Sequence, residues 1–272
     1  MFVSDCSNNR IMGFTASSLY GNNSPNAFVV IGQSSYTTNA SATTQNGLNI
    51  DIGNSYSDLA GKMAFDTSNN MYVADTLNNR ILIFPYGSGF TVGMNASIVI
   101  GQTSFTTATT SATASTLNYP VYLAFDNFGN MFVSDCSNNR VQKFVPPFTT
   151  GMAASMSITG FNNPIGLAFD RLGNLLVADN SNNRILGFPP SALNATTTVS
   201  SATFVLGQPN FTSVVEGIGM QKLNYPQGLA INPETGDLIC AENQNHRIVS
   251  WYYRHITTKT NKLDAKYLFY TD

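Results

Sequence analysis

The sequence predicts an all-β repeat protein, a β-propeller built from four-stranded antiparallel blades, and three observations lead to that prediction. The decapeptide MFVSDCSNNR occurs twice without change, at residues 1–10 and 131–140. Looser copies occupy residues 71–80, 175–184 and 238–247. The apolar runs around the copies are too short for helices and end in clusters of Gly, Pro, Asn and Asp, which are typical of turns between strands. Repeats of this size indicate a propeller or an array.

The repeat at residues 162–207 shows why each element is expected to be a strand. A first strand is expected at 165–169, where an apolar run follows a proline, and a second at 175–178, between two turn-forming clusters. A third is expected at 184–188, before a Pro-Pro pair, and a fourth at 203–206, before Gly-Gln. Four strands joined by turns make one antiparallel meander, and such a meander needs neighbouring sheets to cover both of its faces.

The repeats predict one propeller domain over residues 1–272, with five recognisable blades in a ring of five or six. The blades are expected at residues 1–33, 59–102, 118–160, 162–207 and 224–270. The extra length falls in Ser/Thr-rich loops between the fourth strand of one blade and the first strand of the next. Doubling a flexible loop costs only about 0.6 kcal/mol of closure free energy, so these loops are free to vary. Variable loops on a fixed frame are typical of binding surfaces.

The composition argues against two classes of partner. The chain has 13 basic and 15 acidic side chains and a pI near 5.6, whereas nucleic-acid-binding domains usually show a basic face and a pI above about 9. No stretch reaches the roughly 18 consecutive apolar residues of a membrane helix. We therefore expect neither nucleic acid as a partner nor a membrane span.

Four segments carry a resemblance to a known family. PIGLAFD at 164–170, LVAD at 176–179, NNRI at 182–185 and VLGQ at 205–208 resemble the NHL repeat of β-propellers. The fifth copy contains Asn-His-Arg at 245–247, which is most similar to the triplet that names the family. The resemblance covers nearly all of the first 253 residues and implies the propeller fold. It does not select a function, because NHL propellers include lyases, RNA-binding modules, sensor domains and extracellular scaffolds.

An acidic residue and an arginine recur in every copy, at the end of strand two and the start of strand three. The pairs are Asp5 with Arg10, Asp75 with Arg80, Asp135 with Arg140, Asp179 with Arg184, and Glu242 with Arg247. Their recurrence in every blade indicates a structural role. We expect the carboxylate to accept backbone N–H groups of the following turn, and the arginine to bond to it or to the next blade. The acids that precede the turn after strand one, Asp66, Asp126 and Asp170, are interpreted in the same way.

The sequence predicts no catalytic residue, metal site or cofactor. Amidating lyases of the resembled family hold zinc with histidines, but this chain has only His246, in the repeat motif, and His255, beyond the last motif. A nucleophile elbow and a phosphate-binding loop are both missing from the sequence. Cys6, Cys136 and Cys240 are expected to be free thiols, because equivalent positions on nonadjacent blades lie too far apart for a disulfide.

Two residues are candidates for ligand contact. Lys62 and Tyr122 stand where blades four and five place Gly166 and Gly228. Strand one is innermost in a propeller, so these side chains could project at the mouth of the channel. A basic cluster near the C-terminus is expected to be a solvated tail or edge strand, with contact to an acidic partner as the alternative. It comprises Arg254, His255, Lys259, Lys262 and Lys266.

Five Asn-x-Ser/Thr tripeptides are candidate glycosylation sites, and most of them fall in predicted loops. They begin at Asn22, Asn39, Asn95, Asn194 and Asn210. Together with the low charge and the many hydroxyl side chains, they favour an extracellular or cell-surface protein. The leading hypothesis is a noncatalytic propeller that binds protein or glycan, or serves as a structural assembly module, including as the subunit of a polymer. The alternatives are a lyase or hydrolase that uses the central channel and, least favoured, an RNA-binding module.

The first blade lacks a predicted inner strand. Met1 aligns with Met131, at the start of strand two, whereas Lys266–Tyr270 can supply strand four of the fifth blade. An uncovered inner edge exposes backbone donors and acceptors. The sequence therefore predicts either a window of a longer propeller or a subunit completed by strand addition from a neighbour, which leads to polymers when the contact is head to tail.

Overall fold

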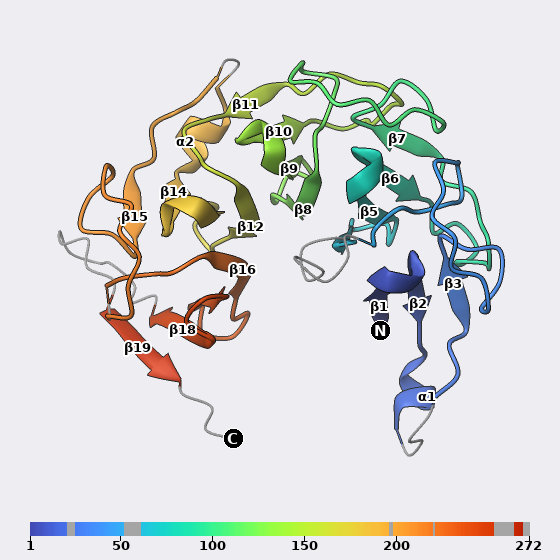
Figure 1. Cartoon of the computed structure of the whole chain (residues 1–272), viewed down its shortest axis with the longest axis horizontal. Coiled ribbons are helices and arrows are strands. Elements are labelled where there is room, and N and C mark those ends of the chain that lie inside the picture. The colour runs from blue at the N-terminus through green and yellow to red at the C-terminus, as the bar shows by residue number, and fades with distance from the viewer. Residues whose placement is uncertain (21–24, 52–60, 196–197, 220, 253–263, 269–272) are drawn as a thin grey trace. The chain divides into compact units, whose positions relative to one another are not determined.

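The computed structural model describes residues 1–272 except 21–24, 52–60, 196–197, 220, 253–263 and 269–272 (Figure 1). Side chains are also not described for strand β19. The chain divides into two compact units, Met1–Leu123 with Phe144–Ala154 and Ala124–Lys143 with Ser155–Asp272.

Five antiparallel sheets follow one another along the chain and confirm the predicted β-propeller with its blades. Blade one contains β1 (Phe2–Asp5), β2 (Arg10–Gly13) and β3 (Val29–Ile31). Blade two contains β4 (Met63–Phe65), β5 (Met71–Asp75), β6 (Arg80–Phe84) and β7 (Ile98–Ile100). Blade three contains β8 (Pro120–Phe125), β9 (Met131–Asp135), β10 (Arg140–Phe144) and β11 (Met156–Ile158). Blade four contains β12 (Pro164–Phe169), β13 (Leu175–Asp179), β14 (Arg184–Phe188) and β15 (Phe204–Leu206). Blade five contains β16 (Pro226–Ile231), β17 (Leu238–Glu242), β18 (Arg247–Tyr252) and β19 (Asp264–Leu268).

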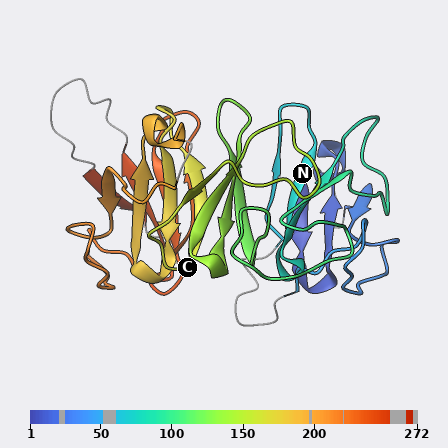
Figure 2. The same cartoon turned by 90° about the horizontal axis from the view of Figure 1, so that it is seen from above.

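Within each sheet the strands are hydrogen-bonded in chain order, so every blade is a meander, with its strands side by side in Figure 2. Two short helices, α1 (Ala16–Leu19) and α2 (Pro190–Leu193), lie in connections after third strands. Blades two to five each begin with an inner strand that pairs with the second strand. Blade one begins with β1, which is itself a second strand, and no inner strand pairs with it among the described residues. The prediction of an incomplete first blade is therefore confirmed.

The turn between strands two and three has the same form in every copy of the decapeptide. In the first four blades a single turn of 3-10 helix ends at an asparagine with positive φ, between 49° and 54°. These asparagines are Asn9, Asn79, Asn139 and Asn183, and in blade five His246 takes the position with φ 49°. Asparagine tolerates this left-handed conformation better than most residues. The turn places the acid of strand two directly opposite the arginine of strand three, as in Asp75↔Arg80.

Successive side chains of a strand point to opposite faces of the sheet. Alternate residues of strand two therefore contact either the following blade or the preceding blade. On one side, which we call the following face, Ser134 donates a hydrogen bond to the Ile165 carbonyl of blade four at 2.6 Å. Phe132, on the same side, packs edge-on against Phe169, with ring centroids 5.1 Å apart.

The opposite side of a blade, the preceding face, packs against the blade before it. Val73 and Met71 of blade two are buried with Ile11 and Ile31 of blade one. In the second unit, Cys240 of blade five is buried in one cluster with residues of blade four. Within the first unit, one hydrophobic core layer therefore lies between blades one and two, and within the second unit another lies between blades four and five.

Candidate functional site

Each repeated acid forms an ion pair with the arginine of its own turn. The distances from arginine Nε to carboxylate oxygen are 2.7 Å in blade one and 2.6 Å in blades two, three and four, and Arg247 contacts Glu242 in the same way. The acids of blades two to five have fully buried side chains, whereas that of Asp5 is 29% exposed. A buried charge is tolerated only when it is paired and hydrogen-bonded, so these pairs have to remain intact in the folded chain.

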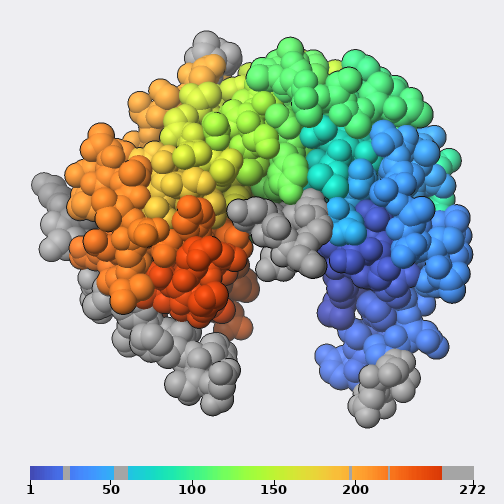
Figure 3. Space-filling model, viewed as in Figure 1, coloured from blue at the N-terminus to red at the C-terminus, as the bar shows by residue number. Residues whose placement is uncertain are grey.

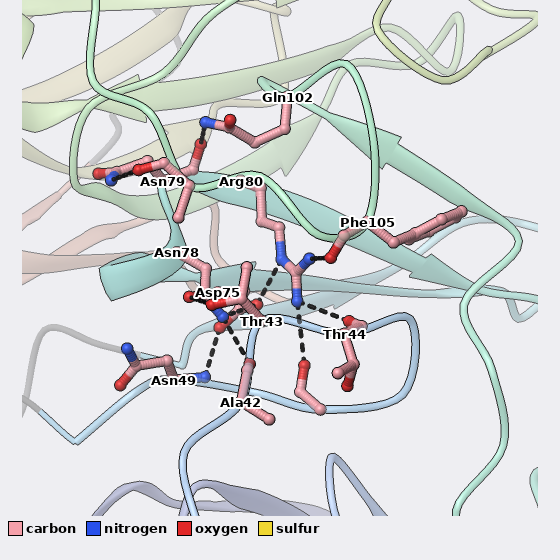
Figure 4. Close-up of polar contacts among 12 residues, drawn as sticks. Ala42, Thr43, Thr44, Asn49, Asp75, Asn78, Asn79, Arg80, Gln102 and Phe105 are labelled. Atoms are coloured by element: carbon pink, nitrogen blue, oxygen red, sulfur yellow. Dashed lines mark hydrogen bonds and ion pairs between the residues drawn. The ribbon is translucent and has the colours of Figure 1, made fainter.

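Asp75 illustrates how the carboxylate is satisfied (Figure 4). One oxygen accepts from Arg80 at 2.6 Å and from Nδ2 of Asn78 at 2.9 Å, and the other accepts from the backbone N–H of Asn49 at 2.6 Å. Burial raises the pKa of the Asp75 carboxyl, and the charge of Arg80 opposes the rise.

The backbone donor lies elsewhere than the sequence predicted. The N–H groups of Asn49, Asn162 and Asn224 donate to the acids of blades two, four and five at 2.6, 2.7 and 2.8 Å. These residues belong to the segment that leads into the first strand of the same blade, and the following turn contributes a side-chain amide. The carboxylate therefore joins the start of its blade to the middle, which a local hydrogen bond to the turn would not do.

On the side away from the carboxylate, three of the guanidinium groups donate hydrogen bonds to backbone carbonyls of loops. Nη1 donates to the carbonyl of an aromatic loop residue, from Arg10 to Tyr36, from Arg80 to Phe105 and from Arg184 to Phe211. Nη2 of Arg80 also donates to the carbonyls of Thr44 and Gly47, at 2.8 and 3.1 Å (Figure 4). One arginine thus links a buried carboxylate to the backbone of loops outside the strands.

A glutamine after strand four holds the same loops. Gln102 donates through Nε2 to the carbonyls of Asn79 and Thr109, at 3.0 and 2.8 Å. Gln33 and Gln208 make the equivalent pair of bonds in blades one and four, to carbonyls of the turn and of the loop. We call the three segments fixed in this way, residues 34–48, 103–117 and 209–219, the frame-held loops.

The left-handed asparagine of each turn makes a bond that sequence reasoning missed. Its Oδ1 accepts a backbone N–H from the segment leading into the next blade. The donors are Ile50 to Asn9, Tyr119 to Asn79, Asn163 to Asn139 and Tyr225 to Asn183, at 2.8 to 2.9 Å. We call these contacts the asparagine bridges. The signal in the sequence is the recurrence of Asn immediately before the Arg in four of the five copies, which turn formation alone also explains.

The frame-held loops expose side chains suited to recognition. Tyr36 is 41% exposed and Phe211 46% exposed, whereas Phe105 packs against the core of the first unit. Hydroxyl side chains surround the aromatic residues, as in Ser35, whose Oγ lies 3.2 Å from that of Thr37. Figure 3 shows atoms of the loops that follow β3 and β7, in blue and green, on the surface in this view.

The structure places Lys62 and Tyr122 at the same position of strand one in blades two and three. Lys62 is half-buried just before β4, and Tyr122 is half-buried within β8. Burial raises the pKa of Tyr122, so this phenol is protonated at neutral pH. Gly166, at the same position in β12, has no room for a side chain, because a Cβ atom there would lie 2.1 Å from the Gln227 carbonyl oxygen of β16. The glycine therefore reflects a close approach of two inner strands.

Four candidate glycosylation sites are exposed: Asn39, Asn95, Asn194 and Asn210. Asn39 and Asn210 belong to frame-held loops. The fifth, Asn22, lies outside the described residues, as do Arg254, His255, Lys259 and Lys262 of the basic cluster. Lys266 lies in β19, whose side chains are not described. Among the described residues, no group of three or more His, Cys, Asp or Glu side chains is placed to hold a metal ion. In the same part of the chain, no helix is long and apolar enough to cross a membrane.

The repeat that the sequence shows most clearly also matches a family model. Residues 161–188, which include β12, β13 and β14, match the model of the NHL repeat. One repeat of this five-bladed β-propeller matches the NHL repeat model. No curated protein matches it.

Three solved structures are similar to this chain. A catalytically inactive virginiamycin B lyase from Staphylococcus aureus with quinupristin has a TM-score of 0.55 and 11% identity, over 97% of this chain and 64% of its own. A putative 6-phosphogluconolactonase from Bacteroides uniformis has a TM-score of 0.50 and 14% identity, over 75% and 55%. A streptogramin B lyase structure has a TM-score of 0.48 and 14% identity, over 77% and 55%.

At such identities the likeness concerns the fold alone. The matched part of this chain spans between 55% and 64% of the length of these three structures.

Proposed function

We propose that this propeller is a noncatalytic extracellular or cell-surface module that binds protein or glycan. The module also associates with other copies of the same chain. The observation that carries the proposal is the use of the repeated charges: they lie inside the frame and fix the backbone of the frame-held loops, while the side chains of Tyr36 and Phe211 in those loops are exposed. A fixed backbone with exposed variable side chains is the arrangement of binding loops in other scaffolds.

The chemistry of the loops supports a polar ligand with apolar patches, such as an oligosaccharide. The frame-held loops at 34–48 and 103–117 are rich in Ser and Thr. In antibody binding loops, rigid aromatic rings supply contact area and small polar groups supply adaptable hydrogen bonds. A sugar ring offers C–H groups to an aromatic face and hydroxyl groups to Ser, Thr and Asn side chains. Tyr36 and Phe211 are the exposed aromatic residues of the loops that match this pattern.

An oligosaccharide array probed with the whole chain tests the glycan version of the proposal. We expect saturable binding to a subset of the oligosaccharides, and at least about tenfold weaker binding, or 1.4 kcal/mol, in Tyr36→Ala or Phe211→Ala. Tyr86→Ala is the matched control, because Tyr86 is 42% exposed but lies outside the frame-held loops. Absence of saturable binding, or an equal loss in the control, would contradict the glycan version.

A lyase or hydrolase is the second candidate, with the half-buried Lys62 and Tyr122 at the same position of strand one as its candidate polar groups. This version predicts that Lys62→Met and Tyr122→Phe leave oligosaccharide binding unchanged and abolish turnover of the bound sugar. Binding without any turnover by the unmodified chain favours the noncatalytic module.

A further inference from the structure

Blade five exposes the face that other blades bury. Ala241 is exposed, whereas Ala178, at the same position of blade four, is fully buried. Ile248 is 40% exposed, whereas its counterpart Ile185 is fully buried. Both counterparts belong to the cluster that blade four forms with blade five. The apolar part of a following face is thus present on blade five without a cover among the described residues.

The polar part of that face is present as well. In blade four, Asn180 donates through Nδ2 to the Pro226 carbonyl of the next blade at 3.0 Å, and its side chain is buried. Asn243, the counterpart in blade five, is exposed. His246 occupies the bridge position of Asn183 and is also exposed. An imidazole has one acceptor and one donor when neutral, so it can stand in for the amide.

Blade one exposes the complementary face. Met1 is 61% and Val3 40% exposed, whereas Met131 and Val133 of the identical decapeptide are fully buried. The third position of the decapeptide belongs to the preceding face: Cys240, its counterpart in blade five, is fully buried in the cluster shared with blade four. Identical residues therefore have different exposures because their surroundings differ.

We propose that the following face of blade five docks against the preceding face of blade one in a second copy of the chain. The contact between blades four and five shows which surface fits a following face, and blade one presents a surface of that kind. In the proposed contact, Ala241 and Ile248 of one copy cover Met1 and Val3 of the other. The two surfaces differ, so the contact is head to tail and each copy can engage a neighbour on either side. This proposal rests on the assembly role under the proposed function, but not on glycan binding.

The average mass of the whole chain in solution tests the contact, measured by light scattering over a wide range of concentration. We expect the mass of the unmodified chain to rise with concentration. Ala241→Arg and Val3→Arg each place an unpaired charge in the contact, so each variant alone is expected to remain monomeric. Phe128→Arg is the control, because Phe128 is 80% exposed at a turn of blade three and lies on neither face.

An equimolar mixture of the two variants distinguishes head-to-tail contact from any other. Val3→Arg retains an intact blade-five face and Ala241→Arg an intact blade-one face, so the mixture is expected to form dimers and nothing larger.

Three results would overturn the proposal: a monomeric unmodified chain at every concentration, assembly by either variant alone, or a monomeric mixture. Near-ultraviolet circular dichroism confirms that each variant is folded, as expected at exposed positions. Tyr36→Ala is expected to leave assembly unchanged, so failure of glycan binding and failure of this contact are separate results.

Discussion

At the scale of the residue, one arginine per blade has two tasks. Its Nε side neutralises a buried carboxylate, and its Nη side donates to loop carbonyls, as Arg80 does with Asp75 and with Thr44 and Gly47. A planar guanidinium can donate in several fixed directions at once, whereas a lysine ammonium cannot reproduce that fork. The repeated charge therefore connects the core of a blade to loops that have no regular secondary structure.

Loss of a buried acid is expected to destabilise the fold strongly. Asp75→Ala leaves Arg80 buried without its counterion, and we expect the free energy of unfolding to fall by about 3–5 kcal/mol. Urea unfolding followed by circular dichroism measures the loss. Asp5→Ala is the matched control, because that pair is partly exposed and is expected to contribute about 1 kcal/mol or less. Equal losses in the two variants would show that burial of the pair is not what matters.

Two cysteines are expected to resist alkylation in the folded protein. Burial raises the pKa of Cys136 to about 12 and also raises the pKa of Cys240. The thiolate is the reactive form, so at pH 8 both groups remain protonated and shielded. Mass spectrometry after treatment with iodoacetamide is expected to show neither residue modified in the native protein and both modified after unfolding. Complete modification of either in the native state would contradict the structure.

At the scale of the element, β1 and β9 show how a strand depends on its partner. They share one sequence, yet β9 pairs on both edges while β1 pairs only with β2 among the described residues. In blade four the inner strand aligns Phe169 opposite Leu175. The same register in blade one would align an added phenylalanine opposite Met1.

A peptide with the sequence of residues 119–127, which contains β8, is expected to bind in trans along the open edge of β1. Backbone hydrogen bonds supply the affinity, so amides of β1 should become protected from hydrogen exchange when the peptide is present. The same peptide with proline in place of Leu123 lacks one donor and is expected not to bind. Protection by both peptides alike, or by neither, would rule out strand addition at this edge.

At the scale of the whole molecule, few charges and many hydroxyl and amide side chains favour an exported protein, and the exposed acceptor sites agree with that proposal. We expect protein from its natural source to carry glycans on at least one of Asn22, Asn39, Asn95 and Asn194. Intact-mass measurement before and after enzymatic removal of N-linked glycans checks this expectation. A mass equal to that of the bare polypeptide would argue against export by the glycosylating route.

The strands, their meander order and the closeness of each acid to its arginine could be predicted from the sequence, whereas the ion pair was one of two partners expected for the arginine. All three depend on residues close together in the chain: apolar runs, turn formers, and a turn that sets Asp75 opposite Arg80. Residue spacing alone is enough to predict such local geometry.

The contacts between segments that are distant in the sequence became known from the three-dimensional structure. It showed that Asn49 donates to Asp75, that Asn183 bridges to Tyr225, and that the approach of Gln227 excludes a side chain at Gly166. The structure also showed that Val3 is exposed whereas Val133 is buried, although both valines lie in the same decapeptide. The physical reason is that burial and hydrogen-bond partners depend on which blade lies alongside, and a repeat gives every blade the same local preferences but not the same neighbour.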